Sequence, residues 1–136
     1  MGSMLERLTG AQNAHDAAGF AAFFADDYRS AQPAHPNRAF SGRAQVLENW
    51  TAVFAGVPDF RARVVASCRD GEVEWGEVEW LGHHGDGSAF AMRGVLILTI
   101  RDDLVAEGRL YVEPVEGSDD DIRAAVDALY RPPGRA

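Results

Sequence analysis

The hydrophobic residues of this chain change their spacing at Pro58, and this change limits the folds that the chain can adopt. Before Pro58, a helix predicted from Arg43 carries one wide apolar stripe, made of Val46, Leu47, Trp50, Val53 and Phe54. Gly56 and Pro58 end that helix. After Pro58, apolar and polar residues alternate with the period of two that is typical of β-strands. Helices followed by strands predict an α+β domain, with the helices gathered on one face of a sheet.

Four strands are expected after Pro58, and hairpin turns join them. They read FRARVVASC at 60–68, EVEWGEVEWLG at 72–82, AFAMRGVLILTI at 89–100 and LVAEGRLYVEP at 104–114. The turns DG, HHGDGS and RDD separate them. The third strand is so apolar in its middle that both of its faces must be covered. We therefore predict a curved, mostly antiparallel sheet whose concave face is crossed by the helix at about 43–55.

The segments before residue 43 are shorter. Residues 4–14 offer a helix with Leu5 and Leu8 on one side, and Asp16 can cap a second helix that buries three phenylalanines before Asp26 ends it. The phenylalanines are Phe20, Phe23 and Phe24. The stretch YRSAQP at 28–33 is expected to form a brief edge strand, because Pro33 closes it.

The ends of the chain are assigned separately from the domain. Residues 1–3 are interpreted as left over from expression and are excluded from the fold. A last helix is expected within 117–130, where Ile122, Val126 and Leu129 share one side and three aspartates suit the positive end of the helix dipole. Residues 131–136 form a tail.

Size and charge restrict the classes of function. A chain of 136 residues with 46% hydrophobic content suits one domain with one core. Its net charge of −8 repels phosphate backbones and anionic membrane surfaces, so we expect neither a nucleic-acid nor a membrane partner. Cys68 is the only cysteine, and no apolar run resembles a signal or a membrane helix. The sequence therefore favours a cytoplasmic protein.

The order of elements resembles the nuclear transport factor 2-like superfamily, which includes SnoaL-like polyketide cyclases, ketosteroid isomerases and limonene epoxide hydrolases. The resemblance covers 4–116 and rests on HPNRAFSGRAQVLENW, DGEVEWGEVEW and MRGVLILTIRDDLVAEGRLYVEP. It implies a cone-shaped domain with an enclosed pocket between the helices and the sheet. Because this fold hosts isomerases, hydrolases, cyclases and binding proteins, it does not by itself identify the reaction.

The same resemblance suggests positions for catalytic groups. Where ketosteroid isomerases carry a carboxylate base on the corner before the long helix, this chain has His35. Where limonene epoxide hydrolases have arginine, aspartate and tyrosine on the last strand, this chain keeps Arg109 and Tyr111 but has Leu110 in place of the carboxylate. On an earlier strand Glu77 and Glu79 resemble that family's arginine and aspartate in placement.

The chemistry of these side chains is compatible with acid/base catalysis, and each also has a plainer interpretation. Histidine side chains suit proton transfer, and Pro36 fixes the backbone before it, but His35 could be a loop residue. Glu77 and Glu79 could lie in a pocket or pair with arginines in water, whereas Glu72 and Glu74 are expected to face water. Arg109 and Tyr111 could hold substrate or form a cross-strand ladder outside. The orientation of Leu110 decides between these two interpretations of Arg109 and Tyr111, because neighbours along a strand face opposite ways.

From these observations we predict a small, cofactor-independent enzyme that isomerises, cyclises or hydrates an apolar molecule. Its catalytic residues would be His35, Glu77, Glu79, Arg109 and Tyr111. Its substrate would contact Tyr28, Trp50, Phe54, Trp75, Met92 and Leu110, of which Trp50, Phe54 and Met92 could instead be plain core. The alternative is a non-catalytic module that binds a small ligand or only dimerises. No metal is expected, and Trp75 or Trp80 on the sheet's outer face predicts a homodimer.

Overall fold

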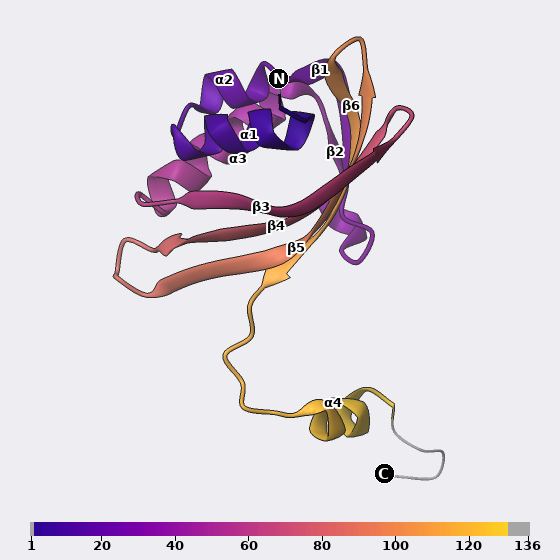
Figure 1. The fold of residues 1–136 in the computed structure, drawn as a ribbon. Helices are drawn as coiled ribbons and strands as arrows, with labels where there is room; N and C mark the ends of the chain where they lie inside the picture. Colours follow the sequence, from indigo (N-terminus) through magenta and orange to yellow (C-terminus); the bar gives the residue numbers. More distant parts are fainter. Residues whose placement is uncertain (1, 131–136) are drawn as a thin grey trace.

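The computed structural model describes residues 2–130 and contains one sheet with helices on one side (Figure 1). The elements in chain order are α1 (Met4–Asn13), α2 (Ala17–Ala21), β1 (Phe24–Ala31), the 3-10 helix η1 (Pro36–Arg38), β2 (Phe40–Ser41), α3 (Arg43–Gly56), β3 (Arg61–Asp70), β4 (Val73–His83), β5 (Ala89–Arg101), β6 (Leu104–Pro114) and α4 (Ile122–Leu129). The strand order is β2-β1-β6-β5-β4-β3, and all neighbours are antiparallel except β1 and β6. The predicted α+β architecture is confirmed.

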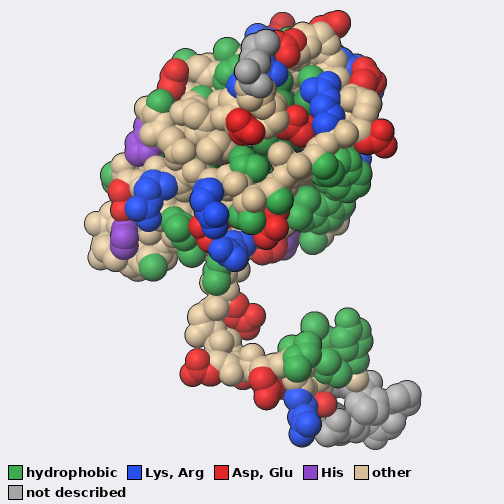
Figure 2. All heavy atoms as spheres, in the orientation of Figure 1, with side chains coloured by type: hydrophobic (Ala, Val, Ile, Leu, Met, Phe, Trp, Pro, Cys, Tyr) green, Lys and Arg blue, Asp and Glu red, His purple; other side chains and the backbone are tan. Residues whose placement is uncertain are grey.

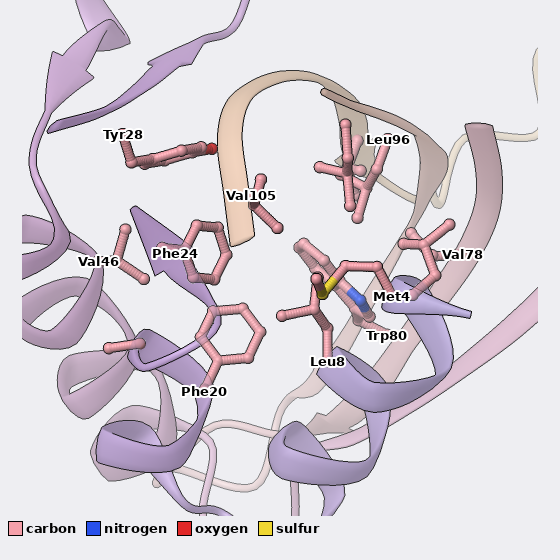
Figure 3. Packing of buried hydrophobic residues seen from close by; sticks show 14 of the residues in the cluster. Met4, Leu8, Phe20, Phe24, Tyr28, Val46, Val78, Trp80, Leu96 and Val105 are labelled. Carbon is pink, nitrogen blue, oxygen red and sulfur yellow. The ribbon is translucent and has the colours of Figure 1, made fainter. Parts of the chain in front are cut away.

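The core lies between α1, α2, α3 and the concave face of the sheet. Figure 3 shows Met4 and Leu8 of α1 and Phe20 of α2 pointing toward Val78, Trp80 and Leu96 of the strands. Val105 on β6 and Phe60 before β3 are also buried. This side of the sheet is apolar because inward-facing residues recur at every second position of β4, β5 and β6.

The change of spacing at Pro58 predicted the second half of the chain closely. The long helix expected at 43–55 is α3, and the four expected strands are β3 to β6, with ends within two residues of those expected. Leu47 lies outside the buried part of the α3 stripe and is 40% exposed. The stripe that faces the sheet is therefore narrower than the sequence suggested.

The segment between Ala21 and Ala31 was assigned wrongly. Phe24 begins β1 instead of ending α2, and β1 lies between β2 and β6 instead of at an edge. The pairing of β1 with β6 shifts register between Phe24 and Arg29, so the alternation of buried and exposed residues is interrupted. That irregularity hides the strand from a search for period two. The edge strand is β2, which has only two residues.

Glu74 faces inward, contrary to expectation, and anchors α1 on the sheet. Its carboxylate accepts hydrogen bonds from the backbone N–H of Met4 at 3.2 Å and of Leu5 at 2.6 Å. The first N–H groups of a helix lack partners within the helix and carry partial positive charge. A buried carboxylate at this end satisfies both groups, which explains why Glu74 is only 2% exposed.

The predicted C-terminal helix is present as α4, and it stands apart from the rest of the molecule beyond the end of β6 (Figure 1). The expected tail at 131–136 lies outside the described residues. No helix within residues 2–130 is long and apolar enough to cross a bilayer.

Candidate functional site

A cavity of about 200 Å³ lies between the helices and the concave face of the sheet. Its lining comes from α1, α2, α3 and from β1, β2, β4, β5 and β6. The lining residues are Leu5, Leu8, Thr9, Gln12, Phe20, Phe24, Tyr28, Ser30, Gln32, Phe40, Val46, Asn49, Trp50, Val53, Val78, Trp80, Leu96, Leu98 and Leu110. None of these side chains is charged at neutral pH. The cavity therefore offers an apolar wall with a few neutral hydrogen-bonding groups.

An aromatic cluster forms one wall of the cavity, with Trp50 of α3 at its centre. The Trp50 ring lies 4.9 Å from that of Phe20, 5.4 Å from Phe60 and 5.3 Å from Trp80, measured between centroids. The contacts with Phe60 and Trp80 are edge-to-face, an arrangement that aromatic rings favour. The wall is thus fixed by packing from α2, α3 and β4.

Tyr28 on β1 provides the most deeply placed hydroxyl group. The side chain is buried, and burial raises the pKa of the phenol, although a hydrogen bond from Ser30 offsets part of this rise. Tyr28 therefore keeps its proton at neutral pH and can donate a hydrogen bond. Gly108 on β6 leaves room for the phenol, because a Cβ at this position would collide with the Tyr28 hydroxyl.

Two amide side chains also reach the cavity. Gln12 on α1 is 4% exposed, and its side chain makes no hydrogen bond within residues 2–130. Gln12 lines the cavity, so its amide can meet a polar group of a ligand there as donor or acceptor. Asn49 on α3 accepts a hydrogen bond through Oδ1 from Gln45 at 2.7 Å, which leaves its amide N–H groups to donate.

Of the residues expected to contact substrate, three line the cavity and three do not. Tyr28, Trp50 and Leu110 line it. Phe54 stacks on His15, with ring centroids 5.0 Å apart, and Met92 packs against the core; neither lines the cavity. Trp75 is 42% exposed on the opposite face of β4.

His35 has a carboxylate partner, but this partner differs from the expected one. Nε2 of His35 lies 2.9 Å from the Glu113 carboxylate of β6, and the imidazole is about one-third exposed. Gln32, three residues before His35, lines the cavity, but His35 does not. Glu113 lies on the outer face of β6, so the structure pairs His35 with a carboxylate outside the cavity lining.

Glu77 and Glu79 lie on the outer face of β4. The Glu79 carboxylate is bound by Arg93 and by Arg63, which lies 3.3 Å away, and hydrogen bonding to Arg93 is the main cause that holds its pKa below the usual range. Glu77 is exposed. This is the arginine-paired arrangement weighed from the sequence, and it separates both carboxylates from His35.

Leu110 of β6 faces the cavity. Its neighbours along the strand, Arg109 and Tyr111, therefore lie on the outer face of the sheet. The five side chains proposed for catalysis thus do not meet at the cavity. Their catalytic roles stay a prediction.

The residues that sequence reasoning missed are the neutral polar ones, Thr9, Gln12, Ser30, Gln32 and Asn49. A signal for three of them was present. Gln12 continues the spacing of Leu5 and Leu8 along α1, Asn49 falls within the α3 stripe, and Ser30 shares a strand face with Tyr28. A polar residue on an apolar face was the clue.

Metal-binding groups do not gather in the described part of the chain. Within residues 2–130, no three His, Cys, Asp or Glu side chains lie close enough together to hold a metal ion.

Comparisons with solved structures agree with this architecture. IdmH of Streptomyces antibioticus, a proposed polyketide cyclase, matches with a TM-score of 0.70 and 20% identity over 80% of this chain and 88% of that chain. RV0760c of Mycobacterium tuberculosis, in complex with estradiol-17beta-hemisuccinate, matches with a TM-score of 0.68 and 16% identity over 79% of this chain and 88% of that chain. A protein of Catenulispora acidiphila with a ketosteroid isomerase-like fold, in complex with trimethylamine, matches with a TM-score of 0.68 and 17% identity over 77% of this chain and 81% of that chain.

At sequence identities of 16–20%, these matches show that the chain shares the fold of the three proteins. A search of curated protein sequences found no match. The model of the SnoaL-like domain matches residues 5–108, which is most of the chain and includes α1 to α3 and nearly all of the sheet. The chain therefore belongs to the SnoaL-like domain family and has the nuclear transport factor 2-like, ketosteroid isomerase-like fold.

Proposed function

We propose that this protein binds a neutral, largely apolar small molecule in the cavity under α3. The observation that carries this proposal is the composition of the lining, which has no charged side chain and several neutral donors and acceptors. A charged ligand would lose its hydration there without gaining an ionic partner, which is costly. A neutral ligand would lose little hydration and would gain contacts with the aromatic wall.

The ligand should carry at least one oxygen atom. The Tyr28 hydroxyl and the Asn49 amide can donate to a carbonyl or hydroxyl, and the Gln12 amide can both donate and accept. In size, a cavity of about 150 Å³ in another protein accommodates benzene. A cavity of about 200 Å³ therefore suits one ring or two small fused rings, and a larger ligand would extend out of it.

The comparisons support a role in small-molecule binding. RV0760c is described in complex with a steroid ester and the Catenulispora protein with trimethylamine. IdmH, the proposed cyclase, provides the link to enzymes of the family.

The test compares two probes of similar shape and different charge. We expect 2-naphthol to bind in isothermal titration calorimetry and to raise the melting temperature, and 2-naphthoate, an anion at neutral pH, to bind at least tenfold more weakly. Val53→Phe fills the cavity and should abolish the binding of 2-naphthol, while Val65→Phe on the exposed part of β3 should not change it. Equal binding of both probes, or binding unaffected by Val53→Phe, would contradict the proposal.

A second candidate is acid/base catalysis on the bound ligand by isomerisation, cyclisation or hydration, without a cofactor. It is favoured by the 2.9 Å contact between His35 and Glu113, because a carboxylate can orient an imidazole for proton transfer. In this function Tyr28 would polarise a ligand carbonyl. With a substrate identified among ketones, lactones and epoxides, His35→Gln should lower turnover about a hundredfold or more and leave stability almost unchanged. A variant with the parental rate and pH profile would leave binding as the function.

A further inference from the structure

The C-terminal helix α4 presents an apolar stripe that nothing in the described chain covers. Ile122 is 79% exposed, Leu129 is 73% exposed, and Val126 and Tyr130 lie on the same side. Figure 2 shows hydrophobic side chains gathered along one side of α4, with charged side chains elsewhere on it. An eight-residue helix with an unpaired apolar side gains most of its stability from packing against another surface.

The outer face of the sheet carries a matching apolar patch. Trp75 of β4, Val95 and Ile97 of β5 and Tyr111 of β6 lie side by side in two adjacent rows of the register, and we call them the outer patch. Trp75 and Tyr111 are each 42% exposed and provide most of its accessible surface, whereas Ile97 is 7% exposed. Cys68 of β3 is the register partner of Trp75 and is also exposed.

The stripe and the outer patch agree in size. Eight helical residues span about 12 Å, and three neighbouring strands span about 10 Å from first to last. The arm at 115–121, which leads to α4, carries Glu116, Asp119, Asp120 and Asp121. Arg109 ends one row of the outer patch and forms no ion pair within residues 2–130, whereas the exposed Glu77 ends the other row. The acidic arm should therefore approach from the side of Arg109.

The direction of the arm indicates that α4 covers the outer patch of a second copy and not that of its own chain. The Val115 N–H donates to the Ala91 carbonyl at 2.9 Å, so the chain still runs along β5 after β6 has ended. It therefore leaves the sheet only after Val115 and moves away from its own outer patch, which lies back along β6 beside Tyr111. Seven extended residues span about 23–25 Å, which is enough to reach another molecule.

We propose that two copies of this chain exchange their C-terminal arms, so that α4 of each copy covers the outer patch of the other. The exchange is symmetric, since each molecule supplies one stripe and one outer patch, and it closes as a dimer. It assigns a contact to the predicted homodimer: helix against sheet, with Trp75 in the interface and Trp80 in the core.

The native Cys68 allows a direct test in the full chain. Ile122→Cys, Val126→Cys and Leu129→Cys each add one thiol to the stripe, and a disulfide forms only where the two Cα atoms approach within about 7 Å. After mild oxidation, at least one variant should give a covalent dimer on a non-reducing gel. The same variant with Cys68→Ser should give none, and Ala128→Cys, on the opposite side of α4, is the matched control.

The other results overturn the proposal. A disulfide within one chain, seen as a Cys68-dependent monomer of altered mobility, would mean that α4 covers its own sheet. A yield no higher than that of Ala128→Cys, or a dimer that persists with Cys68→Ser, would mean that α4 does not cover the outer patch. As an independent measurement, Val126→Asp should weaken dimerisation at least tenfold in light scattering, while Ala128→Asp should not; an unchanged Val126→Asp dimer would also contradict the exchange.

Discussion

The two faces of the sheet differ in the way that they use polar residues. Trp80 and Trp75 are five positions apart on β4 and therefore face opposite ways, with Trp80 in the cavity wall and Trp75 in the outer patch. On the cavity side, the polar groups are amides and hydroxyls. On the outer side they are carboxylates and arginines, including the ion pairs of Glu79 with Arg63 and Arg93.

This difference between the two faces shows that charged residues do not mark the position of the cavity in this protein. An unpaired ion in an apolar site costs far more than an amide does, so chains of this type keep charges on the solvent side of the sheet. Glu74 is the exception, and two backbone N–H groups satisfy it. Ligand recognition inside therefore depends on neutral groups such as Gln12 and Tyr28.

The largest expected difference between the faces comes from the two tryptophans. Trp80→Ala should lower the free energy of unfolding by about 3–5 kcal/mol, because it leaves a hole beside Trp50 and Phe60. Trp75→Ala removes a half-exposed ring and should cost less than about 1 kcal/mol. Urea unfolding at low protein concentration, where self-association is weak, measures both. Equal losses would show that the inner face is not the main core.

The buried carboxylate should give the next largest effect. Glu74→Gln removes the negative charge at the N-terminus of α1 and replaces one acceptor oxygen by a donor, so one N–H of Met4 or Leu5 loses its partner. We expect a loss of about 1–3 kcal/mol in thermal or urea unfolding. Glu72→Gln, at an exposed position on the same β-hairpin, is the control and should change little. A Glu74→Gln protein as stable as the parent would remove Glu74 as the anchor of α1.

Gln12 should matter for ligand binding more than for folding. Gln12→Leu keeps the size of the side chain and removes its hydrogen bonds to a ligand, so the Kd for 2-naphthol should rise about tenfold. Stability should change little, because the Gln12 side chain borders the cavity and its amide is not among the sealed, unpaired polar groups of residues 2–130. Glu48→Leu, at an exposed position of α3 outside the cavity lining, is the comparison variant, and calorimetry with both proteins tests the difference. A Gln12→Leu protein that binds as tightly and unfolds more easily would assign Gln12 to the fold alone.

The sequence predicted the fold better than it predicted the site. Regular alternation identified β3 to β6, and helical spacing identified α1 and α3, because these elements bury one continuous face. The search failed at β1, where the register shift after Phe24 interrupts the alternation, and at β2, which is too short to show a period.

The candidate site was predicted less well because ionisable residues were given the most weight. Strand parity placed Glu77 and Glu79 on one face and Trp80 on the other, but nothing in the sequence says which face is concave. Leu110 could have decided this only once its surroundings were known. The contact between His35 and Glu113 joins residues 78 positions apart, and no local pattern predicts such a pair.

The smallest expected effect concerns the outer ion pairs and their dependence on pH. Arg93 and Arg63 hold the pKa of the Glu79 carboxyl below its usual range, so the folded protein releases this proton at a lower pH than the unfolded chain does. Their stabilising contribution is complete above the unfolded value of about 4.3 and is lost as the pH falls through the lower folded pKa. Glu79→Gln should therefore be less stable than the parent at pH 6–8, and the difference should shrink as the pH falls through the folded pKa. The arginines are more than half exposed, so the difference should be small and should shrink in 1 M salt. Glu77→Gln, on the same face and without an ion pair in the described residues, should show no such dependence. A Glu79→Gln protein that differs from the parent equally at pH 3 and pH 7 would mean that Glu79 stabilises β4 by packing and not by its charge.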